Sequence, residues 1–327
     1  MKTALVTTLR NADATLDYFV AYHLSVGFDH LFLFFDDPDD VSFDRYEGHP
    51  AVTAVKNTVS LRRRWQQTRS AAENYPFANQ EVMARQIMNA HVAGQMALHR
   101  GIDWLLHIDS DELFYSPTEP IADHFAGLSA RGIDVARYLN HEAIPETSRV
   151  QNFFTEVSLF KRNRNTFTPQ QANWFRNHVE VQGPYFSFYD NGKAAALVTD
   201  LTRPMGVHEF EGSTEPVCLT HGPVILHFPC CGFDHFLAKY QTLGHFGDKW
   251  FDRGEAITAV APVHSWSRDV VQAGDKARIR SFYDEVFIRR FERVKDACLR
   301  EGIFIRVQLP PLRQLTHRPL ADIAAAL

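Results

Sequence analysis

Short apolar runs alternate with amphipathic segments along the first part of the chain. Residues 3–9 (TALVTTL) are apolar and rich in β-branched side chains, which predicts a buried parallel strand. From Leu16 onward, apolar residues recur at helical spacing, which predicts a helix that ends at Gly27. Residues 30–35 (HLFLFF) and 51–55 predict the second and third strands.

The same alternation continues to about residue 150. A polar stretch over 57–78 predicts a loop with helical pieces, and 79–100 predicts a helix with a single apolar stripe. Residues 103–108 (DWLLHI) and 133–139 (IDVARYL) predict two further strands. Strands that alternate with helices in this way indicate an α/β fold, a mostly parallel sheet with right-handed crossovers and flanking helices.

The pattern loosens in the second half of the chain, where we expect an irregular α+β arrangement. We predict one domain over 1–327, with a nucleotide-binding half (1–150) and an acceptor-binding half that includes the C-terminal helices (151–327). The elements predicted in the second half are strands at 153–160, 194–198 and 224–228 and helices at 233–243 and 275–301.

Composition narrows the classes of protein. Of the 327 residues, 45% are hydrophobic and 22% are charged, which is typical of a globular protein that buries a large core. The formal net charge of −5 argues against a nucleic-acid binder. The cysteines match no zinc-ribbon or CxxC spacing, so we expect reduced thiols in a cytoplasmic protein; they are Cys218, Cys230, Cys231 and Cys298.

The chain shows no signal-peptide pattern and no apolar run of membrane-spanning length. A partner or a surface patch would therefore have to provide any peripheral contact with a membrane.

Two carboxylates follow the strand predicted at 103–108. Asp109 and Asp111 are separated only by Ser110, at the carboxyl end of a strand, which is where open α/β sheets bind ligands. Carboxylates this close repel each other unless a cation lies between them, and Mg²⁺ or Mn²⁺ prefers oxygen ligands. The triplet therefore predicts a metal that neutralises a leaving diphosphate. The alternative is an acidic turn that caps the next segment.

Polar residues also end the first two predicted strands. Thr8, Arg10 and Asn11 follow the first strand, and Asp36 and Asp37 follow the second. The first group is suited to hold a nucleotide base or ribose, and the aspartates to accept hydrogen bonds from ribose hydroxyls or from the imino N–H of uracil. Turn capping and a solvated acidic loop are the respective alternatives.

The segments TALVTTLRNADATLDYFVAYHLSVGFDHLFLFFD and WLLHIDSDELF resemble glycosyltransferases of the GT-A fold, a Rossmann-like fold. The likeness is greatest to the family 2-like group that includes glycosyltransferase family 92. It extends through YDNGKAAAL (189–197) and ILHFPCCGFDHFLAKY (225–240), although the family more often has a Ser-rich segment at PCCGFDHF. The positions that match or nearly match the family pattern are Asp13, Phe19, His23, Gly27, Gln86 and Asn89.

The resemblance implies inverting transfer of a sugar from a nucleoside diphosphate, commonly UDP, to a hydroxyl of a glycan, polysaccharide or glycolipid. It implies His227 as a third metal ligand or a diphosphate contact, and Lys193 and Lys239 as diphosphate contacts. By residue chemistry alone, His227 is a core histidine and the lysines are surface charges. The nucleotide-binding set that the resemblance implies also includes Gln86, Asp109 and Ser110.

An inverting transferase needs a general base for the acceptor hydroxyl. Glu142, in the segment LNHEAIPE, is our first candidate, and Asp234 and Glu209 are the alternatives.

Three other classes of protein fit parts of the pattern. A nucleotidyltransferase would carry a Gly-rich phosphate loop, and TLRNADATL has no glycine. A non-catalytic nucleotide- or sugar-binding protein would not need both Asp109 and Asp111. A metal-dependent hydrolase would use His107, which lies one pleat further down the strand and is interpreted as a core residue.

Overall fold

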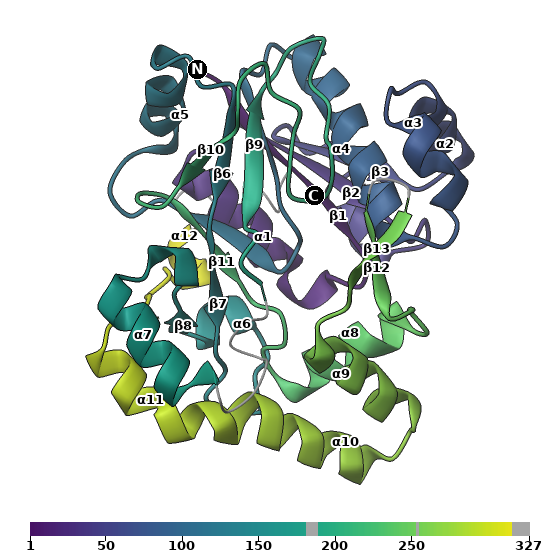
Figure 1. Ribbon diagram of the computed structural model, residues 1–327. Helices are drawn as coiled ribbons and strands as arrows, with labels where there is room; N and C mark the ends of the chain where they lie inside the picture. The colour runs from purple at the N-terminus through teal and green to yellow at the C-terminus, as the bar shows by residue number, and fades with distance from the viewer. Residues whose placement is uncertain (181–188, 253–254, 316–327) are drawn as a thin grey trace.

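The computed structural model describes residues 1–180, 189–252 and 255–315 and shows two sheets with helices packed around them (Figure 1). The larger sheet is mostly parallel, and only β9 runs against its two neighbours. This topology confirms the predicted α/β class. In spatial order the seven strands are β10 (Val217–Leu219), β6 (Val135–Tyr138), β9 (Lys193–Leu197), β4 (Trp104–His107), β1 (Thr3–Leu9), β2 (His30–Phe35) and β3 (Val52–Lys56).

Alternate residues of the central strands face opposite helical layers, as the two-residue period of a strand requires. Leu5 of β1 packs with the helices on one face, and Val6 packs with those on the other. The layer around Leu5 contains α1 (Asp13–Val26) and α5 (Ile121–Ala130). The layer around Val6 contains α2 (Val59–Gln66) and α4 (Val82–His99), and α3 (Ala71–Asn74) and a short 3₁₀ turn (Tyr75–Phe77) lie beside α4.

A second, five-stranded sheet lies below the first in Figure 1. Its strands are β14 (Phe304–Arg306), β8 (Leu159–Lys161), β7 (Asn140–Ala143), β11 (Val224–His227) and β5 (Glu112–Tyr115). Only β7 and β11 are parallel. A hairpin of β12 (Lys249–Asp252) and β13 (Glu255–Ala259) packs near α4.

The remaining helices surround the second sheet and the C-terminal half. They are α6 (Phe153–Glu156), α7 (Pro169–His178), α8 (Phe233–Leu243), α9 (Pro262–Gln272), α10 (Lys276–Tyr283), α11 (Arg290–Arg300) and α12 (Leu312–Leu315), with 3₁₀ turns at Val41–Arg45 and Arg164–Thr166. A π-helical turn, Asp284–Arg289, joins α10 to α11, so the helix predicted at 275–301 is one continuous rod with a bulge.

One predicted strand is wrong in its first half. Residues 153–156 form the helical turn α6, because the Asn152 side chain accepts a hydrogen bond from the Phe154 amide and caps it. The strand β8 begins only at Leu159. Strands β5 and β7 were not predicted, because each has only four residues and follows the preceding strand after a short connection.

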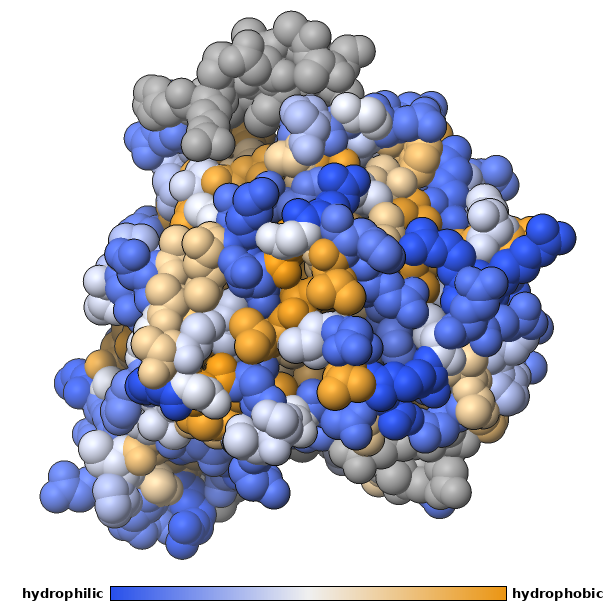
Figure 2. Space-filling model, turned by 90° about the horizontal axis from the view of Figure 1, so that it is seen from above, coloured by the Kyte–Doolittle hydropathy of each residue, from blue (hydrophilic) through white to orange (hydrophobic). Residues whose placement is uncertain are grey.

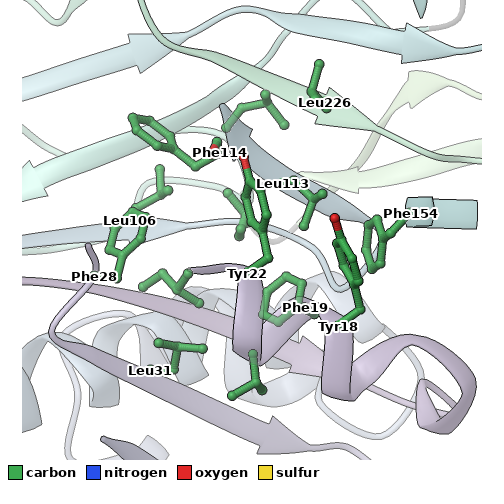
Figure 3. Close-up of a cluster of buried hydrophobic side chains, with 14 of the residues drawn as sticks. Tyr18, Phe19, Tyr22, Phe28, Leu31, Leu106, Leu113, Phe114, Phe154 and Leu226 are labelled. Atoms are coloured by element: carbon green, nitrogen blue, oxygen red, sulfur yellow. Dashed lines mark hydrogen bonds between the residues drawn. The ribbon is translucent and has the colours of Figure 1, made fainter. Parts of the chain in front are cut away.

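An aromatic cluster joins α1 to both sheets (Figure 3). Tyr18, Phe19 and Tyr22 project from α1 toward Leu113 and Phe114 of β5 (Figure 3). The Tyr22 hydroxyl donates to the Phe114 carbonyl at 3.2 Å. These contacts fix β5 on α1, and β5 begins at a residue of the site described below.

His23 of α1 ties the same two elements together through both ring nitrogens. Its Nδ1 donates to the Phe19 carbonyl at 2.8 Å, and its Nε2 accepts from the Phe114 amide at 3.2 Å. Burial lowers the pKa of His23 to about 3, which keeps Nε2 available as an acceptor. The histidine of the family-like pattern is therefore a structural residue.

The described part of the chain contains no helix that is both long and apolar enough to span a bilayer. Its exposed large apolar side chains are spread over different segments of the chain: Met1, Val41, Val59, Leu98, Leu201 and Trp266. On the face seen in Figure 2, apolar residues are interrupted by hydrophilic ones.

Burial of several histidines predicts that the protein loses stability in mild acid. Burial lowers the pKa to about 3 for His107 and to about 4 for His30, His91 and His141. The pKa of an unfolded histidine is near 6.5, so their contribution is fully present above about pH 6.5 and is lost as the pH falls toward 4. We expect the thermal midpoint, measured by circular dichroism, to fall steeply between about pH 6.5 and 4.5.

Two variants separate this effect from the titration of carboxylates. His91→Gln removes one buried titrating group, so the thermal midpoint should fall less steeply as the pH is lowered. His99→Gln changes an exposed residue at the end of α4 and should leave this pH dependence as it is in the wild type. A thermal midpoint that stays constant down to about pH 5 would contradict the prediction.

Candidate active site

The site lies where the chain passes from one sheet to the other. Asp109, Ser110 and Asp111 form the turn between β4 of the larger sheet and β5 of the smaller one. Strands β6 and β7 make a second passage, with only Leu139 between them, and β10 and β11 make a third. Polar residues at the beginnings and ends of these strands therefore meet at the joint of the two sheets.

A row of charged residues crosses the smaller sheet at this joint. Lys161 pairs in register with Glu142, Glu142 with His227, and His227 with Glu112. All four side chains are almost entirely buried. Burial of charged groups is costly unless opposite charges compensate, and here cations and carboxylates alternate along the row. Two members of the row contact the Asp109–Asp111 turn: Glu112 accepts from the Asp109 amide, and His227 lies near Asp111.

Glu142 holds His227 in one orientation. The His227 Nδ1 atom lies 3.0 and 3.2 Å from the two Glu142 carboxylate oxygens, so Nδ1 donates and Nε2 points to the other side of the ring. Nε2 then lies 3.9 Å from Oδ2 of Asp111. Burial alone would lower the pKa of His227, but the Glu142 and Asp111 carboxylates raise it to about 9.

Each aspartate of the triplet is paired with a lysine. Lys193, the first residue of β9, places Nζ 2.6 Å from Asp109 Oδ2, and Lys239 of α8 places Nζ 3.0 Å from Asp111 Oδ2. Burial opposes these charged forms, yet the lysines lower the pKa of both aspartates, and the aspartates raise the pKa of both lysines. The structure thus brings the predicted lysines to the predicted carboxylates.

Asp109 is held from several sides. Its Oδ1 accepts from Gln86 Nε2 at 2.6 Å, and its backbone amide donates to Glu112 Oε2 at 2.8 Å. Glu112 also lies 3.6 Å from Lys193 Nζ. Burial raises the pKa of Glu112 to about 7, with Lys193 opposing and Asp109 adding to the shift. Both carboxylate oxygens of Asp109 are engaged with protein donors.

The strand ends predicted to hold the nucleoside lie beside this centre, with altered roles. Thr8 Oγ1 accepts from Asn89 Nδ2 at 2.9 Å inside the core. The Arg85 guanidinium donates to both carboxylate oxygens of Asp36, from Nε to Oδ1 at 2.5 Å and from Nη2 to Oδ2 at 2.8 Å. This pairing corrects the expectation that the Asp36 carboxylate is open to ribose hydroxyls, because the guanidinium takes both of its oxygens. Asp37 is half-buried and accepts from the Asp39 amide at 3.0 Å.

The turn after β1 faces the surface. Arg10 and Asn11 are exposed, and Asn11 has a left-handed backbone (φ 56°). Its side-chain amide donates to Thr242 Oγ1 at 3.0 Å, which links this turn to the end of α8. The nucleotide contact that the sequence suggests for Asn11 stays a prediction.

The predicted general base needs a correction. Glu142 is 2% exposed, and its carboxylate accepts from His227 and from the Asn140 amide. A base must reach an acceptor hydroxyl, so this burial suits Glu142 to orienting His227 instead. Asp234 is exposed in the first turn of α8, about 140° around the helix from Lys239. The other alternative, Glu209, has its carboxylate 3.8 Å from the guanidinium of Arg137.

The side chains of Asp111 and His227 suit a divalent cation that takes few ligands from the protein. Two ligands of one ion lie about 3–4 Å apart, because each is roughly 2.1 Å from the metal. Asp111 Oδ2 and His227 Nε2, at 3.9 Å, fit this spacing. A carboxylate on the other histidine nitrogen, as at Glu142, is the usual support of a metal-ligating histidine.

Among the residues that the structure describes, no group of three or more His, Cys, Asp or Glu side chains has the geometry of a metal site. Mg²⁺ is commonly bound by one or two carboxylates together with substrate phosphates, so a two-ligand centre remains compatible with a metal that arrives with its nucleotide.

Sequence reasoning missed several residues of the site. Glu112 and Lys161 belong to the charged row, and His208 donates from Nδ1 to the Gly192 carbonyl at 2.7 Å beside Lys193. The Tyr189 ring packs edge-on against His227, with centroids 5.2 Å apart. The only local signal was the polar start of the apolar run ELFY at Glu112.

No protein-family model matches the chain. It is similar to two curated proteins of Arabidopsis thaliana. "Glycosyltransferase-like At3g57200" is 27% identical over 288 residues, which cover 80% of this chain and 52% of that protein. "Glycosyltransferase-like At2g41451" is 27% identical over 336 residues, which cover 93% of this chain and 70% of that protein. The chain thus spans about half the length of the first relative.

Among solved structures, the chain overlaps with core-mannan synthase A of Aspergillus fumigatus in its Mn/GDP form. The identity is 9%, the coverage is 54% of this chain and 48% of that chain, and the TM-score is 0.29, too low to carry an argument. The two plant relatives confirm the likeness to glycosyltransferases, while membership of family 92 stays a prediction.

Proposed function

We propose that this chain is a glycosyltransferase that moves a sugar from a nucleoside diphosphate to a hydroxyl acceptor with the help of a divalent cation. The observation that carries the proposal is the joint of the two sheets, where Asp111, His227 and Glu142 are arranged as a ligand pair with its orienting carboxylate. The similarity to two glycosyltransferase-like proteins supports the same class.

Asp111 and His227 would hold the metal, with Asp109 beside it. When bound, a divalent cation neutralises charge on the departing diphosphate. The chain's own residues supply the rest of the electrostatic environment. Lys193 and Lys239 place two ammonium groups at the same centre, and ammonium groups are suited to phosphate oxygens.

Glu142 keeps Nδ1 of His227 protonated and directs Nε2 to the centre, so it acts as a positioning residue. Gln86 and Lys193 hold the two oxygens of Asp109 and fix the turn that carries Ser110. These contacts limit the reorganisation that the site requires when a nucleotide binds.

The finer parts of the proposal are a UDP-linked donor, Mn²⁺ or Mg²⁺ as the metal, inversion at the anomeric carbon, and a glycan, polysaccharide or glycolipid acceptor. Asp234 is our candidate for the general base because its carboxylate is exposed, and the acceptor would have to reach it about 140° around α8 from Lys239. Asp37 and Arg10 are candidates for nucleoside contacts at the strand ends.

A thermal-shift screen tests donor and metal together. UDP, GDP, CMP and ADP are each added with Mn²⁺ and with EDTA. We expect one nucleoside diphosphate, UDP first, to raise the melting temperature only with metal, since a ligand that binds the native state stabilises it in proportion to the logarithm of its concentration over Kd. Absence of any shift across the screen would contradict the proposal.

A further inference from the structure

One carboxylate oxygen at the centre is shared by two groups. Oδ2 of Asp111 lies 3.0 Å from Lys239 Nζ and 3.9 Å from His227 Nε2. A divalent cation held between this oxygen and His227 would stand within a few ångströms of the ammonium group. Like charges at such a distance repel strongly in a partly buried site. Lys239 and the metal therefore compete for the same oxygen.

The two lysines of the site differ in their freedom to move. The Lys193 side chain is 1% exposed and is surrounded by Asp109 at 2.6 Å, the Val207 carbonyl at 3.4 Å and Glu112 at 3.6 Å. The Lys239 side chain is 22% exposed and reaches Asp111 from the side of α8. A lysine carries its charge on a flexible stem that can move where neighbours leave room. Because Lys239 is the more exposed of the two, it is the lysine that a ligand can shift.

We propose that Lys239 compensates the charge of Asp111 until the donor binds, and that it then moves from the carboxylate to the diphosphate while the metal takes its place. The inference rests on the proposed function. The exchange leaves the net charge of the site unchanged, because the two positive charges of the metal are balanced by the two negative charges of a sugar-linked diphosphate.

The exchange couples the binding of the metal to the binding of the nucleotide. Metal alone has to displace an ammonium ion that has no new partner, so it binds weakly. Nucleotide supplies that partner, so each ligand raises the affinity for the other by the same factor. Lys239 is in this sense a positioning residue that couples the two binding events.

Mn²⁺ binding measured by calorimetry or by electron paramagnetic resonance tests the coupling without turnover. In the wild type we expect UDP, or GDP if the melting screen selects it, to raise Mn²⁺ affinity at least about tenfold. Lys239→Met should raise the affinity for Mn²⁺ alone by about tenfold, and it should reduce the gain that nucleotide adds. Lys295→Met is the matched control, because Lys295 pairs with Glu146 at the same distance of 3.0 Å away from the site.

The outcomes separate this inference from the function on which it rests. Unchanged Mn²⁺ affinity in both Lys239→Met and Lys239→Gln, with cooperative binding in the wild type, overturns the exchange and leaves the transferase proposal standing. A wild type that binds neither Mn²⁺ nor nucleotide overturns both. Circular dichroism and melting curves establish that each variant is folded. The second substitution at Lys239 keeps the test available if the first variant does not fold.

Discussion

Asp111→Asn is expected to lower kcat/KM by about a thousandfold or more while leaving the fold intact. The change keeps the size of the side chain and removes its charge, so Lys239 and His227 lose the carboxylate that they share. Electrostatic groups aimed at a developing charge are typically worth about 10²–10³ in rate, and loss of a metal ligand adds to this. The assay is release of nucleoside diphosphate from the donor that the melting screen identifies.

Asp296→Asn is the control, because Asp296 is an exposed aspartate on α11, away from the joint of the sheets. We expect its activity to match the wild type. For Asp111→Asn we also expect that Mn²⁺ no longer changes the melting temperature in the presence of nucleotide. Wild-type turnover by a folded Asp111→Asn protein would remove the basis for placing a metal at this oxygen.

The first half of the fold follows from local patterns in the sequence. Strands β1, β2 and β4 are short apolar runs that pair in parallel. The helices α1 and α4 were predicted from apolar residues at helical spacing, although both are buried on more than one face. Such patterns depend on neighbours a few positions apart, which is the range that periodicity can detect. The location of Asp109 and Asp111 after β4 follows from the same reasoning.

Most of the smaller sheet was not predictable in the same way, although β11 matches the strand predicted at 224–228. Its charged row joins Glu112, Glu142, Lys161 and His227, and the register that aligns them comes from pairings between distant segments. No local period marks a strand of three or four residues that begins directly after another one ends. The sequence therefore located Glu142 as a carboxylate near the site and missed that its partner is His227.

The partner of the Asp36 side chain, near the predicted nucleoside contacts, was also beyond the reach of local sequence patterns. Its place at the end of β2 was predictable, but Arg85, which takes up both of its oxygens, lies 49 positions away on α4. Charged residues that end strands are good markers of a ligand-binding edge. Which of them face the ligand depends on partners that only the folded chain brings together.

Gly192→Ala is expected to be the most damaging small substitution next to the site. A Cβ atom there would lie 1.9 Å from the Tyr138 carbonyl oxygen and 2.8 Å from its carbon, where the chain passes from β6 to β7. The backbone on both sides is held, because the Gly192 amide donates to Asn140 Oδ1 at 3.2 Å and its carbonyl accepts from His208 at 2.7 Å. Relief of the clash must move Lys193 or the joint itself.

Gly132→Ala separates this clash from the strain of the backbone conformation. Gly132 has a φ of +71° and Gly192 a φ of +67°, but a Cβ at Gly132 meets nothing within 4 Å. We expect Gly132→Ala to cost about 1–2 kcal/mol of unfolding free energy in urea titrations, the cost of a left-handed non-glycine residue. Gly192→Ala should cost about 4 kcal/mol or more, since backbone overlap adds to the same strain. Equal costs for the two variants would mean that the passage between the sheets is looser than these distances imply, and that Lys193 is not held in place by it.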